Sequence, residues 1–484
     1  MKHALRNAFP VGFALTLALA CNDGRIQKKK DPPPIPEPVC GDGRVDADAG
    51  EQCDGSDLGG NSCTSLGFDL GTVSCDAQCR LVTSQCVKLC GDGKIGPGEE
   101  CDGTLGPLAC PGWGYKACSA SCKVDAIHCR SESFAVGTPI SFSSGGVSIL
   151  TDLAPEGPGD LVTAVPEFFR LQTHAWDPTK GFEANRVMSR MNDAERPALP
   201  IAGDLDGDGH VDLAAIHMSG QVARFRFVPA GSSNPTDRFQ VEPLPLPADG
   251  GTPCVVDRWI GVGALDSAPG ADLAALGCPT TSAPEDDAIF VFRGGDQPSE
   301  PTRIDAPLTT AATLADDDGD GLLDLIVVDD AHQVSIRRAP DFGPGTQAAL
   351  GMGDPVTALA AGDLDGDGDA DLVTVTATEL TIFENTGGAF AERRSETAAA
   401  FFPLVRDLDL DGLLDLAWVE DGRVQVRRNL GGFTFAPLEF ATGPGTPIGL
   451  SAGDVEGDDD PDLAASVLTA SPKSVTYVFI NPVR

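Results

Sequence analysis

The feature that most constrains the fold is an acidic nine-residue pattern that recurs through the C-terminal two thirds of the chain. Its first full copy, from Asp204 to Asp212, places carboxylates at positions 1, 3, 5 and 9. Three further copies keep this spacing, and a fifth has glutamate at position 3 and aspartate at position 6. Four carboxylates packed into nine residues repel one another strongly unless a cation lies between them. A loop with a purely structural role is therefore the poorer explanation.

The spacing suits calcium. Ca²⁺ takes six to eight oxygen ligands at about 2.3–2.6 Å, and alternate residues of a tight loop can turn their carboxylates inward. A glycine such as Gly209 or Gly321 permits the sharp turn, and the backbone carbonyl at position 7 completes the shell. We predict about five structural Ca²⁺ sites, with ligands from Asp204, Asp206, Asp208, His210 and Asp212; Asp316, Asp318, Asp320, Leu322 and Asp324; Asp363, Asp365, Asp367, Asp369 and Asp371; Asp407, Asp409, Asp411, Leu413 and Asp415; and Asp454, Glu456, Asp458, Asp460 and Asp462.

Two degenerate copies bring the number of loops to seven. One runs from Asp152 to Asp160 and keeps Glu156 at position 5, whereas the loop from Asp266 to Asp272 is interpreted as two residues shorter than the others. Cys254 and Cys278 flank this second loop symmetrically, so strands that fold back about residue 266 place them opposite each other. We predict a disulfide between them that replaces the missing metal.

The loops are expected to be hairpin turns in an all-β fold. Strand-like sequence flanks them, and the closing aspartates recur every 44 to 60 residues, a period that with four strands per repeat indicates propeller blades. The seventh repeat has only three strands before Arg484, and we predict that residues 134–142 supply the fourth and close the ring. The expected fold is a seven-bladed β-propeller with Ca²⁺-binding hairpin loops, preceded by two small disulfide-rich modules.

These loops differ from EF-hands, because they close with aspartate at position 9 rather than glutamate at position 12. The repeat resembles the FG-GAP family, the calcium-bearing blades of integrin α-subunit propellers and of many bacterial surface proteins, over residues 134–484. The resemblance implies that the calcium loops lie on one face and that ligands are met on the other. Residues 277–288 form the longest loop expected on that opposite face.

Twelve of the fifteen cysteines lie in two segments of the N-terminal part of the chain. Residues 40–86 and 90–129 each hold six, and both segments contain Cys-Gly-Asp-Gly followed by Gly-Glu-x-Cys-Asp. Modules of this size bury too little apolar surface to fold unaided, so three disulfides per module are expected, with any of 15 connectivities. Zinc is the weaker alternative, because the cysteine counts are even and Cys-x2-Cys pairs are absent. The pattern resembles the cysteine-rich repeat of myxobacterial surface proteins.

The N-terminus is typical of an export signal. Two basic residues precede an apolar stretch from Ala8 to Ala20, so residues 1–20 are predicted to be cleaved. The sequence before Cys21 resembles a lipobox, although Ala18-x-Ala20 also suits ordinary signal peptidase. Since Cys21 is the one cysteine left over by pairing, lipidation is favoured. Residues 21–39 are then a lipid-anchored, proline-rich linker, and the protein is an outer-membrane or cell-surface lipoprotein.

Charge and motifs narrow the function. A formal charge of −38 disfavours nucleic acids and anionic lipid surfaces, so contact with a membrane is expected only through the anchor. The sequence has no His-Glu-x-x-His, phosphate-binding glycine loop or Gly-x-Ser-x-Gly elbow, and no catalytic residue is predicted. We expect a non-enzymatic, calcium-binding adhesion module for a protein or polysaccharide partner. An enzyme acting on extracellular polysaccharide and a ligand-free spacer are the alternatives.

Overall fold

The computed structural model contains only strands and irregular segments in the part of the chain that it describes. None of these residues lies in a helix long and apolar enough to cross a membrane. The described residues are 40–482, apart from 48–49, 67, 69, 88–93, 96–98, 103–109, 111–112, 120, 126–128, 131–133, 138, 143–145, 154–158, 166–169, 178, 180, 183–185, 191–196, 218, 228–238, 250–251, 278–286 and 471–472. Cys21 and the predicted signal and linker therefore lie outside the described residues.

The chain divides into two compact units, Met1–Leu89 and Cys90–Arg484. The first contains the first cysteine module, in which three disulfides join Cys40 to Cys79, Cys53 to Cys75 and Cys63 to Cys86. Two short strand pairs complete it: β1 (Leu70–Gly71) with β4 (Cys86–Val87), and β2 (Ser74–Cys75) with β3 (Leu81–Val82). The pairing selects one of the fifteen connectivities and confirms disulfides rather than zinc.

The second cysteine module repeats this pairing. Its disulfides Cys101–Cys118 and Cys110–Cys129 match the second and third bonds of the first module, and β5 (Ala117–Cys118) pairs with β6 (Val124–Asp125). Cys79 and Cys122, at equivalent places, both have a positive φ. Residues 90–129 and 134–484 both belong to the compact unit Cys90–Arg484; their division into two domains stays a prediction.

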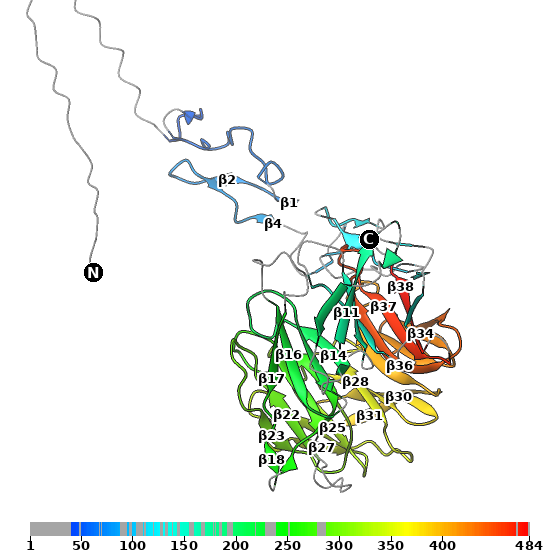
Figure 1. The fold of residues 1–484 in the computed structure, drawn as a ribbon. Coiled ribbons are helices and arrows are strands. Elements are labelled where there is room, and N and C mark those ends of the chain that lie inside the picture. The colour runs from blue at the N-terminus through cyan, green and yellow to red at the C-terminus, as the bar shows by residue number, and fades with distance from the viewer. Residues whose placement is uncertain are drawn as a thin grey trace, which may run out of the picture. The chain divides into compact units, whose positions relative to one another are not determined.

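Seven antiparallel sheets follow one another as propeller blades, as predicted (Figure 1). Blade one contains β9 (Ser148–Thr151), β10 (Asp160–Val165), β11 (Arg170–Asp177), β12 (Gly181–Phe182) and β13 (Arg186–Arg190); blade two β14 (Pro197–Gly203), β15 (Asp212–His217), β16 (Val222–Phe227) and β17 (Phe239–Leu244); blade three β20 (Val256–Gly263), β21 (Asp272–Gly277), β22 (Ala288–Phe292) and β23 (Thr302–Asp305); blade four β24 (Thr309–Ala315), β25 (Asp324–Asp329), β26 (Gln333–Arg337) and β27 (Thr346–Ala349).

Blades five to seven have the same order. Blade five contains β28 (Ala358–Gly362), β29 (Asp371–Val375), β30 (Glu379–Asn385) and β31 (Phe390–Thr397); blade six β32 (Phe401–Arg406), β33 (Asp415–Glu420), β34 (Arg423–Asn429) and β35 (Phe435–Ala441); blade seven β36 (Thr446–Gly453), β37 (Asp462–Leu468), β38 (Ser474–Ile480), β7 (Ala135–Val136) and β8 (Ile140–Phe142). A small hairpin of β18 (Ala248–Asp249) and β19 (Thr252–Pro253) precedes blade three.

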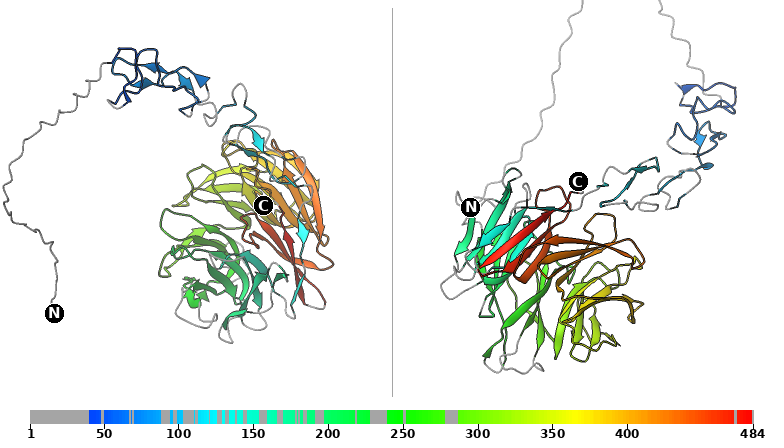
Figure 2. Two further views of the ribbon diagram at one scale, coloured as in Figure 1. Left: turned by 90° about the horizontal axis from the view of Figure 1, so that it is seen from above. Right: turned by 90° about the vertical axis from the view of Figure 1, so that its right-hand side faces the viewer.

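The ring closes with an N-terminal segment, as the sequence predicts. In blade seven, β7 and β8 both pair with β38, through Val136 opposite Phe479 and Ile140 opposite Thr476. The first strand of each blade contacts the first strand of the next, and β36 of blade seven contacts β9 of blade one. In Figure 2 the colours accordingly run around the ring until red β38 lies beside the cyan segment.

The hydrophobic core lies between the blades. Second strands such as β15, β21 and β29 are buried along their whole length, because both of their faces are covered by neighbouring sheets. Seven clusters of buried side chains occur in the described residues, one at each interface between successive blades, including that between blades seven and one. This continuous packing places all seven loops that join first and second strands on one face of the propeller.

Candidate metal-binding loops

Each acidic loop is organised by its first carboxylate. Asp204 accepts hydrogen bonds from the backbone N–H groups of Gly207 (2.8 Å), Asp208 (3.1 Å) and Gly209 (3.0 Å). Equivalent bonds are made by Asp316, Asp363, Asp407 and Asp454. The turn requires left-handed backbone, with φ of 86° at both Gly209 and Gly321, which confirms the role predicted for these glycines.

The closing aspartate joins the loop to the strands. In blade six, Asp415 is fully buried and accepts the N–H of Leu408 (3.0 Å) from the loop and that of Asn429 (2.7 Å) from β34. Asp371 and Asp462 make the same pair of bonds in blades five and seven. The side chain at position 9 is therefore fixed by the hairpin before any cation binds.

Four of the five predicted sites bring carboxylate oxygens within 4.8 Å of one another. These groups are Asp204, Asp206 and Asp212; Asp316, Asp318 and Asp320; Asp363, Asp365 and Asp371; and Asp407, Asp409 and Asp415. Asp212 is fully buried, and its Oδ2 has no hydrogen-bond partner. A buried carboxylate oxygen without a partner is costly, so its position beside Asp204 and Asp206 fits a bound cation.

The fifth predicted loop has the same backbone but a different side-chain arrangement. Asp459, which replaces glycine, has a left-handed φ of 66°, and the N–H of Asp460 donates to Asp458 at 3.2 Å. Glu456 has a buried Oε2 without a hydrogen-bond partner. Glutamate has one methylene more than the aspartate at this position in the four carboxylate groups above. Its unpartnered Oε2 again fits a cation ligand.

The position-7 residues take part in the loops through their backbone. The N–H groups of His210, Leu322, Asp369 and Leu413 donate to the carboxylates two residues earlier, at 2.8–3.0 Å. These bonds orient the carboxylate at position 5. That the carbonyl groups of the same residues bind the ion stays a prediction. In the degenerate first loop, Glu156 lies outside the described residues.

The loop of blade three corrects the sequence interpretation. Gly263 pairs with Asp272, as Gly203 pairs with Asp212, so this loop is as long as the others and begins at Ala264. It retains carboxylates only at positions 3 and 9, Asp266 and Asp272. Arg293 Nη1 lies 3.2 Å from each of them and donates to the Leu265 carbonyl at 3.0 Å. One guanidinium thus contacts both carboxylates that remain in this loop.

The predicted disulfide does not replace this metal. Cys254 is disulfide-bonded, whereas Cys278 lies outside the described residues, so their pairing stays a prediction. Cys254 precedes Val256, which pairs with Gly277 at the opposite end of the hairpin from the acidic loop. Eight residues of β20 separate the two ends, about 25 Å at the usual rise. The disulfide can hold the strands together there, but Arg293 supplies the local charge.

Burial disfavours the ionised form of the loop carboxylates when no counter-ion is present. It raises the pKa of Asp212 to about 6, of Asp371 to about 7 and of Asp462 to about 9. Backbone hydrogen bonds to these carboxylates act in the opposite direction but do not offset the desolvation. Burial, and after it the neighbouring Asp411 carboxylate, likewise raise the pKa of Asp409 to about 7. A cation in the loops would remove this cost.

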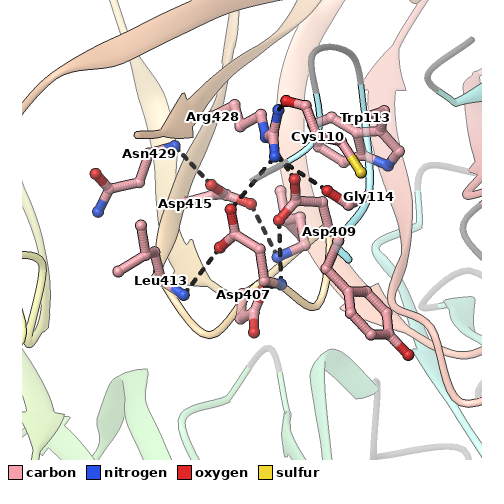
Figure 3. Close-up of polar contacts among 12 residues, drawn as sticks. Cys110, Trp113, Gly114, Asp407, Asp409, Leu413, Asp415, Arg428 and Asn429 are labelled. Carbon is pink, nitrogen blue, oxygen red and sulfur yellow. Dashed lines mark hydrogen bonds and ion pairs between the residues drawn. The ribbon is translucent and has the colours of Figure 1, made fainter. Parts of the chain in front are cut away.

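Loop six is also in contact with the second cysteine module (Figure 3). Arg428 is 4% exposed; its Nε forms a close ion pair with Asp409, and its Nη2 lies 3.3 Å from Asp411. The same guanidinium donates to the backbone carbonyls of Cys110 and Gly114, each at 3.0 Å. Sequence reasoning missed this arginine because all its partners are distant in the chain. The loop carboxylates lie 17 to 19 residues earlier, and the two carbonyls lie more than 300 residues earlier.

An axial cavity of about 840 Å³ is lined by the first strands of all seven blades. Lining residues such as Leu359 and Leu450 lie three positions before the strand ends at the acidic loops. Phe401 and Phe402 line it and are 46% and 39% exposed. Phe402 has a φ of 56°, which a bulky residue rarely adopts. The cavity therefore lies toward the face opposite the acidic loops and has an exposed aromatic pair in its wall.

Comparison with known proteins agrees with the repeat pattern. Residues 316–374 and 407–465 match the family model for the FG-GAP-like repeat. No curated protein matches the chain. Among solved structures, BBS1N in complex with ARL6DN is similar in two crystals, soaked with lead (TM-score 0.52) and mercury (TM-score 0.50), each with 12% identity over 72% of this chain and 97% of that one.

A lectin from Agrocybe aegerita that recognises non-reducing terminal N-acetylglucosamine is also similar, with 17% identity and a TM-score of 0.45 over 70% of this chain and 86% of that one. At these identities the likeness to BBS1N concerns the fold alone. The chain thus carries FG-GAP-like repeats in a seven-bladed propeller that follows disulfide-bonded cysteine-rich modules.

Proposed function

We propose that this FG-GAP-repeat propeller is the calcium-stabilised binding module of an exported, lipid-anchored surface protein. A propeller of FG-GAP-like repeats suggests a binding module, and the disulfides are typical of proteins in oxidising, extracellular surroundings. The single observation that supports calcium most directly is the group of Asp204, Asp206 and Asp212, in which a fully buried carboxylate oxygen lacks a partner.

Calcium would act in structure rather than in chemistry. The acidic loops join the first and second strands, so a cation there would hold the two strands together and offset part of the charge of four carboxylates at once. Extracellular Ca²⁺ sites bind at about 10⁻⁴–10⁻³ M. At about 1 mM Ca²⁺, each occupied loop would then add about 0.4–1.4 kcal/mol to the free energy of unfolding.

The partner would bind at the face opposite the loops. The axial cavity has a size typical of binding pockets, about 300–1,000 Å³, and Phe401 and Phe402 offer exposed aromatic surface beside it. Aromatic rings of this kind suit both the apolar faces of sugars and hydrophobic protein side chains. A protein or polysaccharide partner, bound without turnover, is consistent with this surface.

Two measurements test the proposal. Elemental analysis of purified residues 22–484 should find four to six Ca²⁺ per chain, and EGTA should lower the melting temperature strongly; no bound Ca²⁺ and no shift would overturn the calcium part. Binding to arrayed glycans and to surface proteins should be weakened by Phe401→Ser, with Leu430→Ser, a comparably exposed residue outside the cavity lining, as control. Turnover of a glycan would identify an enzyme, and absence of any ligand would favour a spacer.

Anchoring is tested separately. Mass analysis of the mature N-terminal peptide should show a diacylated or triacylated Cys21, and Cys21→Ser should release the protein into the medium. A free N-terminal Cys21 would mean that ordinary signal peptidase acts there and that the protein is secreted without an anchor.

A further inference from the structure

The residue that faces the closing aspartate across the second and third strands differs from blade to blade. In blade two, Leu213 pairs with Phe225, which places Asp212 opposite Arg226. The same register places an arginine opposite the closing aspartate in three further blades: Arg293 opposite Asp272, Arg338 opposite Asp324 and Arg428 opposite Asp415. In blades five and seven, this place holds Glu384 and Ile480.

The four arginines contact the same part of their loops. Arg226 Nε forms a close ion pair with Asp206, and Arg338 Nη1 lies 3.0 Å from Asp318. Arg293 and Arg428 contact the position-3 carboxylates of their own loops in the same way. The arginine therefore always reaches position 3, although its Cα lies opposite position 9.

In blade three this contact offsets one of the loop's two negative charges without a metal. Only Asp266 and Asp272 remain there, and Arg293 contacts both. Blades two and six keep four carboxylates, blade four has a fifth in Asp317, which also pairs with Arg338, and each loop contacts one arginine, so a net negative charge remains for a cation. In blade five, Glu384 is ion-paired with Arg393, and the loop carboxylates have no ion pair among the residues that the structure describes. This loop even adds a fifth acidic residue, Asp369.

We propose that the residue opposite the closing aspartate sets the cation affinity of each loop. A guanidinium a few ångströms from the ion site repels a divalent cation, and at partly buried distances this interaction is large enough to change the dissociation constant about tenfold or more. Loops 363–371 and 454–462, which lack the arginine, are the tight sites. Loops 204–212, 316–324 and 407–415 are the weaker sites, and loop 264–272 holds no ion. The inference rests on the proposed calcium binding.

Native mass spectrometry at buffered free Ca²⁺ tests this order by counting ions per chain. Residues 22–484 should bind two Ca²⁺ at concentrations about tenfold below those that fill three more sites. Asp365→Asn should remove one tight ion, and Asp318→Asn should remove one weak ion. These two variants assign the classes to blades five and four.

Substitutions at the facing residue test the cause. Arg226→Met keeps the apolar stem but removes the charge, and it should raise the number of tight ions from two to three. Glu384→Arg should lower it to one. Arg423→Met is the matched control, because Arg423 begins β34 at the end away from the loop and pairs with Glu439; it should leave both classes unchanged.

The outcomes separate the inference from the function on which it rests. Absence of bound Ca²⁺ at every concentration overturns the proposed calcium binding itself. Five sites of equal affinity overturn the inference alone. An Arg226→Met variant that binds its ion more weakly also overturns it, because the arginine would then orient Asp206 for the metal. Melting temperature in EGTA serves as a second readout. If Arg226→Met folds, it should be less stable than the wild type without Ca²⁺ and gain more from Ca²⁺.

Discussion

The indole Nε1 of Trp113 donates a hydrogen bond of 2.7 Å to Oδ1 of Asn481, across 368 positions of the chain. The side-chain amide of Asn481 in turn donates to the carbonyls of Leu408 (2.6 Å) and Pro461 (3.1 Å), in the acidic loops of blades six and seven. Trp113 is 2% exposed and packs on Phe134 just before the closing strand β7. The second cysteine module is thus attached to the part of the ring where closure occurs.

Replacement of this indole should loosen the module. Trp113→Phe keeps an aromatic ring but leaves Oδ1 of buried Asn481 without its partner, at a cost of about 1–3 kcal/mol in the free energy of unfolding. Urea denaturation measures this loss, and limited proteolysis should show faster cleavage within residues 90–133. Trp176→Phe, in blade one, makes the same chemical change elsewhere and should not alter cleavage there. Equal cleavage in all three proteins would contradict the attachment.

Asparagines at the ends of third strands should contribute to the contacts between blades. Asn429 Nδ2 donates to Leu364 O of the preceding blade at 2.7 Å and to Leu414 O at 3.0 Å. Asn429→Ala leaves both carbonyls unpaired and should lower the free energy of unfolding by about 1–3 kcal/mol. An unchanged urea midpoint would show that water replaces the amide. Asn61→Ala, in the separate first module, is the control, because Asn61 donates only to nearby Leu58.

Removal of the closing segment should destabilise the whole ring. A chain that begins at residue 146 lacks β7 and β8 and exposes the edge of β38, including partners of Ile140 and Phe142. We expect its melting temperature to fall by several degrees or more relative to a chain that begins at residue 130, because a few kcal/mol of pairing and burial are lost. Equal melting temperatures for the two chains would mean that the closing strand is not required.

Stability should depend on pH differently with and without calcium. Burial raises the pKa of Asp371 from 3.8 to about 7 and that of Glu456 from 4.5 to about 7. The metal-free folded chain therefore holds more protons than the unfolded chain in this range. The contribution of these groups is fully present below about pH 4 and is lost as pH rises through about 7.

Melting curves in EGTA between pH 5 and pH 8 should therefore move to lower temperature as pH rises. In excess Ca²⁺ the decline should disappear, since the cation replaces the protons and binds better to the ionised loops. Asp371→Asn, which cannot ionise, should reduce the decline in EGTA. A metal-free protein that becomes more stable toward pH 8 would be incompatible with the raised pKa values.

The cysteine pair of blade three is open to direct mapping. Cys254 is disulfide-bonded, and peptide mapping of the exported protein should find it joined to Cys278. Cys254→Ser should lower stability by about 2–4 kcal/mol, the usual effect of a disulfide that closes a loop of this length. It should leave the number of bound Ca²⁺ ions unchanged, because the bond lies at the far end of the hairpin from the acidic loop.

The sequence alone determined the features of this protein that are local or periodic. The carboxylates from Asp204 to Asp212 lie within one nine-residue turn, and the recurrence of that turn defines seven blades and the need for residues 134–142 in the ring. Such features are visible without a structure, because turn chemistry and strand alternation act over a few residues. The even cysteine counts likewise indicated disulfides but not their pairing.

Only the tertiary structure decided which charges meet. Arg293 offsets carboxylate charge in a loop that ends 21 positions earlier, at Asp272. Arg428 joins loop six to Cys110 and Gly114. The length of the loop at Ala264 also became clear only from the pairing of Gly263 with Asp272. These relationships depend on strand register and on the packing of distant segments. A one-residue change of register would turn each arginine to the other face of its sheet, and nothing in the local sequence specifies that choice.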